Sequence, residues 1–438
     1  MGDIALIYPF SQQNSRTTML FHPLGIAQIS SMLRRDGLDV TVVDLTFEDE
    51  PDVFVELERL NPRIIGVYVM LTMYERARTI ARRIREILPD TVLACGGPMP
   101  TLDPDRFSSD FDYVFRGEAV DSFPRFCRDY LNGKNREDML LHSQDYPGFY
   151  HRDLRTGTLT SVAPESSDER RLNLLPLPDR SDYNHARYQL FWIEREGFSP
   201  AGIMTTFGCP YTCDFCSKPI FGNYFRRRHM DNLVHEIHDI KSWGYDGLWI
   251  ADDCFTLDLD HVRSFCTRMI RENLEMEWTC LSRTEGVPVD ITHLMKQAGC
   301  KKVFFGLESG DNSVLKLMNK NTTVESAEKT LTQFSQCGIE TAGFFMVGYP
   351  GESYETIEQT FAWALKLPLD ELSFTTPFPL PGTGLYRKVR GLQKDADWRF
   401  ENENRFTYRS EFDEEYLHRR IEETYERFSK RKNHHPRL

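Results

Sequence analysis

Residues 205–222 read TTFGCPYTCDFCSKPIFG and place three of the chain's ten cysteines within a short stretch. The three are Cys209, Cys213 and Cys216, with the spacing C-x3-C-x2-C. Thiolates in such a cluster bind zinc or iron–sulfur centres. A structural zinc site takes four ligands, usually two C-x-x-C pairs or two cysteines with two histidines, and no second pair follows here. Three thiolates instead fit a 4Fe–4S cluster that leaves one iron open, which is what catalysis at a metal requires.

The spacing alone leaves two other interpretations open, a zinc knuckle and a set of three buried thiols. The later cysteines stand singly, mostly within strand or helix patterns, so they do not form a partner pair. They are Cys254, Cys266, Cys280, Cys300 and Cys337.

Around this loop, short apolar runs alternate with amphipathic helical patterns. Six such βα units predict a partial (β/α)6 barrel over residues 196–388, with a short helical tail over 389–438. Because the three-cysteine loop follows the first of these strands, it lies on the face where barrel sites form. The expected strands are residues 202–207, 247–253, 277–282, 301–309, 341–350 and 371–377.

A second run of alternating patterns fills residues 1–135. Continuous apolar strands between amphipathic helices predict a doubly wound parallel sheet that is buried on both faces. Residues 136–195 are rich in Pro, Asp, Arg and Ser with weak periodicity, which predicts a linker that wraps a surface and carries a small hairpin. The sequence therefore predicts an α/β protein. Its expected strands in this first part are residues 4–10, 39–45, 64–71, 91–97 and 112–118.

Composition narrows the class of protein. The formal net charge of −13 argues against a nucleic-acid surface, which usually needs a basic face. No apolar run approaches the roughly 20 residues of a membrane-spanning helix. The start, MGDIALIYPF, lacks the basic region and apolar stretch of a signal peptide. We therefore expect a cytoplasmic protein whose cysteines are ligands or core residues and not disulfides.

The cysteine loop resembles the signature of the radical S-adenosylmethionine (SAM) superfamily, which carries an aromatic residue, here Phe215, before the last cysteine. The resemblance implies a 4Fe–4S cluster held by Cys209, Cys213 and Cys216, with SAM chelating the open iron through its amino and carboxylate groups. The reduced cluster then passes one electron to the sulfonium. A carbon–sulfur bond breaks and yields a 5′-deoxyadenosyl radical. Phe215 is expected near the adenine.

The resemblance also implies SAM-binding residues at the ends of other barrel strands. GLESG, after the fourth strand, is the segment that faces SAM in the family, and it contributes Gly306, Glu308 and Ser309. A carboxylate there suits the ammonium group of the ligand. MVGYPGES ends the fifth strand, where Gly348 lets the backbone approach the ligand closely.

Two further strand ends complete the expected SAM site. ADDCFT ends the second strand, where Asp252 or Asp253 can reach a ligand, and LSRTEG ends the third, where Arg283 can pair with the ligand carboxylate. A single acidic residue after a strand is more often a helix cap or a solvated charge. Their joint appearance at the strand ends of one barrel is what favours a binding site.

The whole arrangement is similar to the cobalamin-binding, or class B methyltransferase-like, branch of the radical SAM enzymes. The segments that carry this resemblance are HPLGIAQISSMLRRDGLDVTVVDL, LACGGPMPTLDP and VFRGEA. Ligands of open α/β sheets bind beyond the carboxyl ends of the strands, where glycines admit a flat macrocycle. The alternative is a sheet of this kind that has lost cobalamin. The expected cobalamin-binding residues are Leu71, Thr72, Met73, Tyr74, Gly96, Gly97 and Gly117.

One feature departs from many cobalamin proteins, because the chain lacks the D-x-H-x-x-G motif whose histidine ligates cobalt. His22 has no such context, and a surface or packing role is expected for it. The resemblance then implies a cobalamin whose lower face is free or capped. We expect the loop from Leu71 to Tyr74 to approach that face.

The resemblance implies methylation of an unactivated carbon of a small-molecule intermediate, through the 5′-deoxyadenosyl radical and methylcobalamin. The expected partners are a small-molecule substrate and a reductase or flavodoxin-type electron donor, without nucleic acid. A cyclisation, rearrangement or oxidation on the same fold is the main alternative. An RNA-modifying enzyme ranks lower because the first domain has only Cys95 and Cys127 and the charge is acidic. A non-enzymatic iron–sulfur protein is the last alternative.

Overall fold

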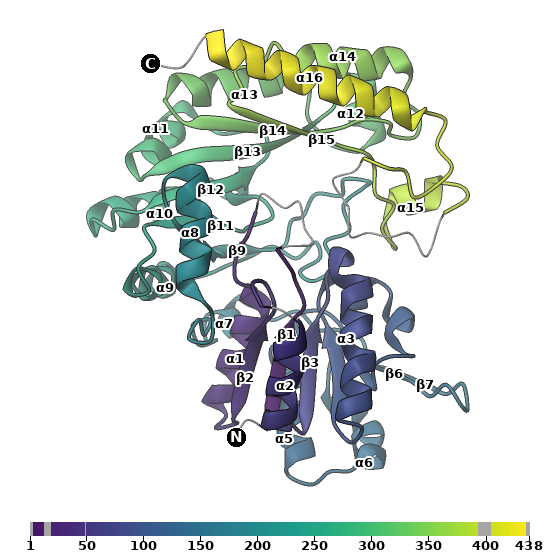
Figure 1. Cartoon of the computed structure of the whole chain (residues 1–438). Helices are drawn as coiled ribbons and strands as arrows, with labels where there is room; N and C mark the ends of the chain where they lie inside the picture. Colours follow the sequence, from purple (N-terminus) through teal and green to yellow (C-terminus); the bar gives the residue numbers. More distant parts are fainter. Residues whose placement is uncertain (1–2, 13–18, 49, 393–403, 435–438) are drawn as a thin grey trace. The chain divides into compact units, whose positions relative to one another are not determined.

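The computed structural model describes residues 3–12, 19–48, 50–392 and 404–434 (Figure 1). By its internal contacts the chain divides into two compact units, and the main change from one to the other falls between Arg195 and Glu196. The segment expected to be a linker thus belongs to the first unit. Parts of the predicted C-terminal region, residues 393–403 and 435–438, lie outside the described residues.

The first unit is built on one sheet with the strand order β2-β1-β3-β4-β5-β6-β7. Strands β1 to β5 are parallel, which confirms the doubly wound sheet predicted from the apolar runs. Every residue of β1 is buried, because β1 is central and helices cover both faces of the sheet. The strands are β1 (Ile4–Tyr8), β2 (Val40–Asp44), β3 (Ile64–Tyr68), β4 (Val92–Gly96), β5 (Tyr113–Phe115), β6 (Phe149–Arg152) and β7 (Leu159–Ser161).

The helices of the first unit form from the amphipathic segments between the strands. Helix α1 (Leu24–Arg35) packs against α5 (Ser122–Leu131), whereas α3 (Tyr74–Ile87) connects β3 to β4. Strand order reverses at β1 and β3, the point where ligands bind in open sheets of this kind. The other helices are α2 (Glu50–Leu60), η1 (Leu71–Met73), α4 (Pro98–Leu102), η2 (Pro104–Phe107), α6 (Arg136–Leu141), η3 (Ser143–Asp145), α7 (Glu169–Leu172) and α8 (His185–Glu196).

Residues 136–195 contribute strands and a helix to the first unit. Strands β6 and β7 form an antiparallel hairpin that pairs with β5 and extends the first sheet. Helix α8 returns to the start of the chain, where the Trp192 indole donates to the Leu20 carbonyl at 2.6 Å and the Tyr188 hydroxyl to Asp44 at 2.7 Å. Such contacts between distant segments leave no periodic pattern, which is why composition predicted a linker here.

The second unit holds a six-stranded parallel sheet with the order β15-β14-β13-β12-β11-β8. This open, curved sheet is the predicted partial barrel. A two-stranded antiparallel ribbon, β9 (Thr206–Phe207) with β10 (Arg226–Arg227), follows the first strand. The strands are β8 (Pro200–Ile203), β11 (Gly247–Ile250), β12 (Glu277–Ser282), β13 (Cys300–Glu308), β14 (Glu340–Met346) and β15 (Glu371–Thr375).

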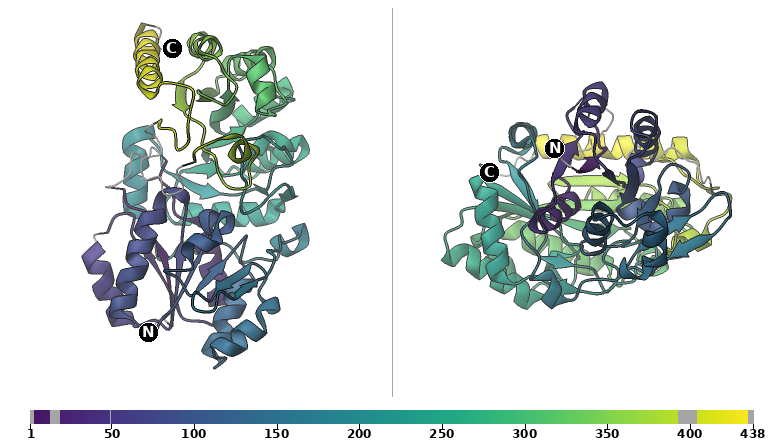
Figure 2. Two further views of the ribbon diagram at one scale, coloured as in Figure 1. Left: turned by 90° about the vertical axis from the view of Figure 1, so that its right-hand side faces the viewer. Right: turned by 90° about the horizontal axis from the view of Figure 1, so that it is seen from below.

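Helices lie along the outer side of this curved sheet (Figures 1 and 2). The tail, α16 (Glu414–His434), packs against α14 (Tyr354–Ala364). No helix among the described residues has both the length and the hydropathy needed to cross a bilayer. The remaining helices are α9 (Met230–Ser242), η4 (Phe255–Leu257), α10 (Leu259–Arg271), α11 (Val289–Gln297), α12 (Asn312–Leu317), α13 (Val324–Gln336) and α15 (Gly384–Lys388).

Two glycines that follow barrel helices provide a matched test of the fold. Gly299 follows α11 at φ +97°, and an added Cβ would lie 2.4 Å from the Met276 carbonyl oxygen. Gly338 follows α13 at φ +73°, and its Cβ would meet only the Lys296 Cε at 3.8 Å. We expect Gly338→Ala to cost about 1 kcal/mol from backbone strain alone. Gly299→Ala is expected to cost about 3 kcal/mol, because strain and overlap add.

Urea unfolding followed by far-UV circular dichroism measures this difference. Equal midpoints for the two variants would contradict the packing described around Gly299.

Candidate functional site

A short antiparallel β-ribbon holds the two ends of the three-cysteine loop together. Phe207 pairs with Arg226 and Thr206 with Arg227, so the two strands of the β9–β10 ribbon bring both ends of the intervening segment together. The loop itself has no regular structure beyond two turns. In these the Cys216 amide donates to the Cys213 carbonyl at 3.1 Å and the Gly222 amide to the Lys218 carbonyl at 3.1 Å. Its position therefore depends on contacts with other parts of the barrel.

Asp214, inside the loop, makes those contacts. Its amide donates to the Met318 carbonyl at 2.9 Å, and its carbonyl accepts from the Leu385 amide at 3.0 Å. Its carboxylate accepts a short hydrogen bond from the Tyr349 hydroxyl and pairs with the Lys388 Nζ at 2.8 Å. One residue thus ties the loop to segments that follow β13, β14 and β15.

The donor set fits an iron–sulfur cluster. Cys209 and Cys213 are half-buried and Cys216 is exposed, whereas burial raises the pKa of core cysteines such as Cys254 to about 11. Within the described ranges, no three His, Cys, Asp or Glu side chains converge in the manner of a metal site. The assignment of the cluster to this loop therefore rests on three cysteines that lie in one anchored segment and outside the core. All ten cysteines lie in the described structure, and none is in a disulfide.

Arg283, after β12, places a buried positive charge beside the loop. Its Nη1 lies 3.4 Å from the Cys213 Sγ, and its guanidinium sits 3.9 Å from the centre of the Tyr211 ring. It forms a two-pronged pair with Glu285 at 3.1 and 3.0 Å. Burial opposes the charge, but Glu285 and Cys213 outweigh it and raise the pKa of Arg283. The guanidinium is therefore in contact with the Cys213 sulfur, while its predicted pairing with SAM stays a prediction.

Glu308 and Lys320 form a buried ion pair at the end of β13. The Lys320 Nζ donates to Glu308 Oε1 at 2.7 Å and lies 5.9 Å from the centre of the Phe215 ring. Glu308 adopts φ +62°, which is unusual for a residue with a side chain and is frequent at functional sites. An added Cβ at Gly306 would lie 2.7 and 2.8 Å from the two charged atoms, so the glycine leaves room for the pair.

Asp252 and Ser309 form hydrogen bonds with other residues of the protein in this structure. Asp252 is fully buried and accepts from the Thr205 amide at 2.6 Å, the Thr205 hydroxyl at 2.5 Å and the Thr206 hydroxyl at 2.7 Å. Burial raises the pKa of Asp252 to about 6, although these hydrogen bonds act to lower it. Ser309 is buried, and its hydroxyl oxygen lies 3.2 Å from the hydroxyl oxygen of Thr360. Their contact with SAM remains a prediction.

Gly348 follows β14 and packs against protein. At φ +86°, an added Cβ would lie 2.6 Å from the Phe406 ring. Glu352 holds this turn, because its Oε2 accepts from the amides of Gly348 at 2.8 Å and Tyr349 at 2.7 Å. Burial raises the pKa of Glu352 to about 7, so this carboxyl titrates near neutrality.

The residues predicted to bind cobalamin lie at the carboxyl ends of the parallel strands β3, β4 and β5 of the first sheet. β3, β4 and β5 are neighbours, so Gly96 at the end of β4 lies beside the segments that follow the other two strands. Gly97 adopts φ +108°, and its Cβ would lie 2.9 Å from the Val69 carbonyl. Gly117 adopts φ +75°, and its Cβ would lie 2.9 Å from Pro164. The glycines thus permit close packing of the chain against Val69 and Pro164, and their contact with cobalamin stays a prediction.

The segment after β3 is the helix η1, which leads into α3. Leu71 and Thr72 are half-buried, whereas Met73 is in the core. Tyr74 is also buried, with its ring 5.4 Å from that of Phe107. Leu71 and Thr72 are therefore the more accessible members of this predicted cobalamin-binding set.

His22 has the packing role expected for it. It is buried, with its ring centre 4.7 Å from that of Tyr188 and 5.2 Å from that of Tyr183. Burial lowers the pKa of His22 well below its ordinary value.

Comparison with known proteins identifies both units. A model of the radical SAM superfamily matches residues 203–364, and a model of the B12 binding domain matches residues 15–126. The chain is 27% identical over 389 residues to an uncharacterized methyltransferase of Pyrococcus horikoshii, which covers 86% of this chain and 81% of that protein. It is 24% identical over 416 residues to cytidylyl-2-hydroxyethylphosphonate methyltransferase of Streptomyces wedmorensis, with coverage of 84% and 77%.

A solved structure has the same fold. The radical SAM methyltransferase TsrM from Kitasatospora setae, with cobalamin and a 4Fe–4S cluster bound, aligns with a TM-score of 0.73 over 89% of this chain and 75% of its own. At 18% sequence identity this likeness concerns the fold alone.

A B12-binding domain followed by a radical SAM domain defines a distinct class of metalloenzyme. This chain carries both domains, which is the domain combination of the cobalamin-binding radical SAM enzymes. The two domains confirm the cofactor set expected from the sequence, namely a 4Fe–4S cluster, SAM and cobalamin.

Sequence reasoning missed the residues that position the site. Asp214 and Glu352 were not among the predicted site residues. Lys320 lies 12 residues from its partner Glu308, beyond any helical or strand spacing. The one available signal was the acidic residue inside the cysteine spacing, because a charge in a half-buried loop needs a partner.

Asp214 provides a test of loop positioning. We expect Asp214→Ala to weaken retention of the cluster about tenfold or more, as loss of a residue that orients metal ligands typically does. Loss of the iron–sulfur absorbance under a chelator, measured without oxygen, reports this. Tyr349→Phe removes one of the contacts and should give a smaller effect. Asp231→Ala, whose side chain is 86% exposed, is the matched control. Equal retention in Asp214→Ala and the control would contradict the anchoring role.

Asp252 provides a test of pH dependence. Its folded pKa of about 6 lies above the ordinary 3.8, so folding favours its protonated form. That contribution is fully present below about pH 4 and is lost as the pH rises through about 6. Asp252→Asn stays neutral. The unfolding free energy of wild type minus that of the variant should therefore fall by about 3 kcal/mol from pH 4 to pH 7. A difference that does not change with pH would show that the fold leaves the pKa of Asp252 at its ordinary value, and one that rises with pH would show that the fold stabilises the ionised form. Either result would contradict the expectation.

Proposed function

We propose that this protein methylates an unactivated carbon of a small molecule. The observation that carries the proposal is the presence in one chain of an anchored three-thiol loop at the end of the first barrel strand and of a sheet edge suited to cobalamin. When bound, the cofactors supply a carbon radical and a transferable methyl group. The relatives named as methyltransferases support this outcome.

In this proposal Cys209, Cys213 and Cys216 hold the cluster. Arg283 places its guanidinium 3.4 Å from the Cys213 Sγ, where a positive charge suits an anionic cluster. Asp214 keeps the loop in position through its contacts with three other segments. These residues therefore prepare the ligand set before the cluster assembles.

The pair of Glu308 and Lys320 is suited to the charges of SAM. The amino acid end of SAM carries an ammonium and a carboxylate, which complement a carboxylate and an ammonium on the protein. Both side chains are already desolvated, so an exchange of partners leaves no buried charge unpaired. Phe215 lies beside Lys320 and contributes the apolar wall expected near the adenine.

On the first unit, Gly96, Gly97 and Gly117 are proposed to face cobalamin, together with the segment from Leu71 to Tyr74. The burial of His22 among aromatic rings supports a cobalamin without that histidine as its lower ligand. No side chain of the described residues is assigned here as a general base.

The remaining expectations complete the proposal. A reductase or flavodoxin-type protein supplies the electron, and the acidic net charge favours a substrate other than nucleic acid. Reduced thiols favour the cytoplasm. We propose four functional segments: residues 1–135 for cobalamin, 136–195 as a wrapping segment, 196–388 for the radical SAM barrel and 389–438 as the helical C-terminal region.

Turnover with SAM that carries an isotopic label in its methyl group tests the reaction. Candidate small molecules are incubated with the reduced, reconstituted protein, and the products are analysed by mass spectrometry. Label in the product supports methyl transfer. Cleavage of SAM with an unlabelled, altered product would instead show cyclisation, rearrangement or oxidation.

The three thiol ligands can be tested without a known substrate. The triple change of Cys209, Cys213 and Cys216 to Ala should abolish cluster binding, because no thiolate remains in the loop. Iron content and visible absorbance after reconstitution measure this. Cys337→Ala, at a half-buried cysteine outside the loop, should retain a full cluster. A cluster that survives the triple change would refute the assignment.

A further inference from the structure

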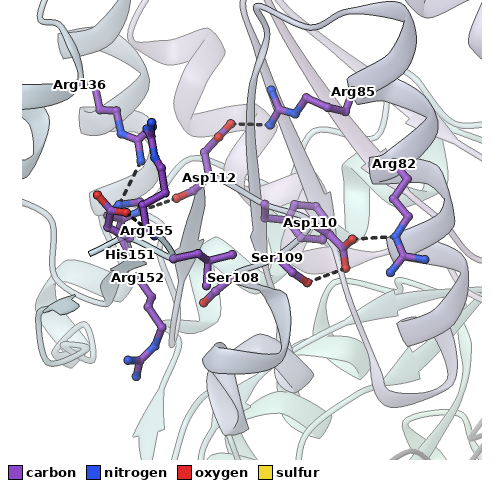
Figure 3. Close-up of a pocket in the computed structure, with 13 residues that line it drawn as sticks. Arg82, Arg85, Ser108, Ser109, Asp110, Asp112, Arg136, His151, Arg152 and Arg155 are labelled. Carbon is purple, nitrogen blue, oxygen red and sulfur yellow. Dashed lines mark hydrogen bonds and ion pairs between the residues drawn. The ribbon is translucent and has the colours of Figure 1, made fainter. Parts of the chain in front are cut away.

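A cavity of about 300 Å³ lies on the first unit, away from the predicted cobalamin edge (Figure 3). It is lined by the end of α3, by the loop of residues 108–112 that leads into β5, and by the β6–β7 hairpin. Because that loop precedes β5, the cavity lies at the amino end of this strand. Gly96 and Gly117 lie at the opposite, carboxyl end of the parallel strands. The cavity is therefore separate from the site described above.

The lining of the cavity carries an excess of positive charge. It contains five arginines and three aspartates, in a protein whose net charge is strongly negative. An arginine-rich hollow on an acidic protein indicates selection for an anionic ligand, since local charge of this kind concentrates counter-ions. The arginines are Arg82, Arg85, Arg136, Arg152 and Arg155.

Three of the arginines are neutralised by the protein. The Arg82 Nε pairs with Asp110 at 2.8 Å, and the Arg85 Nη2 pairs with Asp112 at 2.8 Å (Figure 3). Arg152 pairs with Asp105 at 2.6 Å. These ion pairs hold the walls of the cavity in place.

The other two arginines, Arg136 and Arg155, make no ion pair with a carboxylate in the described part of the chain. The Arg136 Nη2 lies 3.2 Å from the His151 Nε2. The other ring nitrogen of His151 lies 2.8 Å from the Asp112 carbonyl and donates to it, so Nε2 accepts from Arg136. Figure 3 shows Arg136 and Arg155 on the same side of the cavity, beside His151.

Asp153 is turned toward the backbone of its own hairpin. Its Oδ1 accepts from the amides of Arg155 at 2.8 Å and Thr156 at 3.3 Å. This turn fixes the backbone from which the Arg155 side chain projects. The Asp153 carboxylate thus closes the hairpin and does not form a salt bridge with either guanidinium.

We propose that this cavity binds the phosphate group of a small phosphorylated molecule. A phosphate monoester carries close to two negative charges at neutral pH, which matches the two guanidinium groups without a carboxylate partner. The planar donors of Arg136 and Arg155 fit phosphate oxygens in pairs. The inference does not depend on the proposed methyl transfer.

Isothermal titration calorimetry on the full-length, reconstituted protein tests the proposal. Inorganic phosphate and glycerol 3-phosphate serve as probes at matched ionic strength, so that general screening is equal. Wild type should bind both. The double variant Arg136→Ala/Arg155→Ala should bind at least about tenfold more weakly, because two charge-assisted contacts are lost.

Matched variants control for net charge and for folding. Arg59→Ala/Arg83→Ala removes the same charge from exposed positions on the same unit and should leave phosphate binding unchanged. Arg155→Ala alone, at an exposed side chain, covers the case in which the double variant fails to fold.

The outcomes separate the sources of the ligand. Tighter binding of glycerol 3-phosphate than of phosphate identifies a phosphate ester as the natural ligand, and equal binding identifies free phosphate. Absence of binding by wild type, or equal binding by the Arg136→Ala/Arg155→Ala and control variants, would overturn the proposal.

Discussion

The candidate site depends on one anchored loop. The segment that carries the three cysteines has no helix or strand, and its own backbone supplies only two turns. Asp214 provides the missing constraint, because its amide, carbonyl and carboxylate together bind the segments that follow β13, β14 and β15. The Glu352 carboxylate in turn holds the backbone of Tyr349, one of those partners. The loop is thus positioned by residues other than its cysteines.

Buried charges around the loop are balanced in pairs, as the low dielectric interior requires. Arg283 faces Glu285 and the Cys213 sulfur, and Lys320 faces Glu308. Asp252 has no cationic partner in its hydrogen-bond set, so burial raises its pKa and threonine donors hold it. The acidic residues at strand ends therefore divide into those that accept only from neutral donors, such as Asp252, and those that pair with a cation, such as Glu308.

Much of the fold could be predicted from local pattern. The expected strand at residues 277–282 coincides with β12, and the helix that starts at Met230 is α9. Periodicity succeeds here because it records which side of an element is buried. It failed for residues 136–195, where the hairpin and α8 are held by contacts such as that between Trp192 and Leu20. In the site, spacing was enough for the cysteines, while the contacts of Asp252 and Arg283 were not foreseen.

The sequence by itself determined the order of the strands and helices, the spacing of the three thiols and the glycines at the strand ends. These features follow from local burial and from the chemistry of single residues. Only the tertiary structure decided the partners, since Arg283 is 70 residues from Cys213 and Lys388 is 174 residues from Asp214. The physical reason is that parallel strands bring the loops at their carboxyl ends to one edge, where side chains distant in sequence pair according to charge and shape.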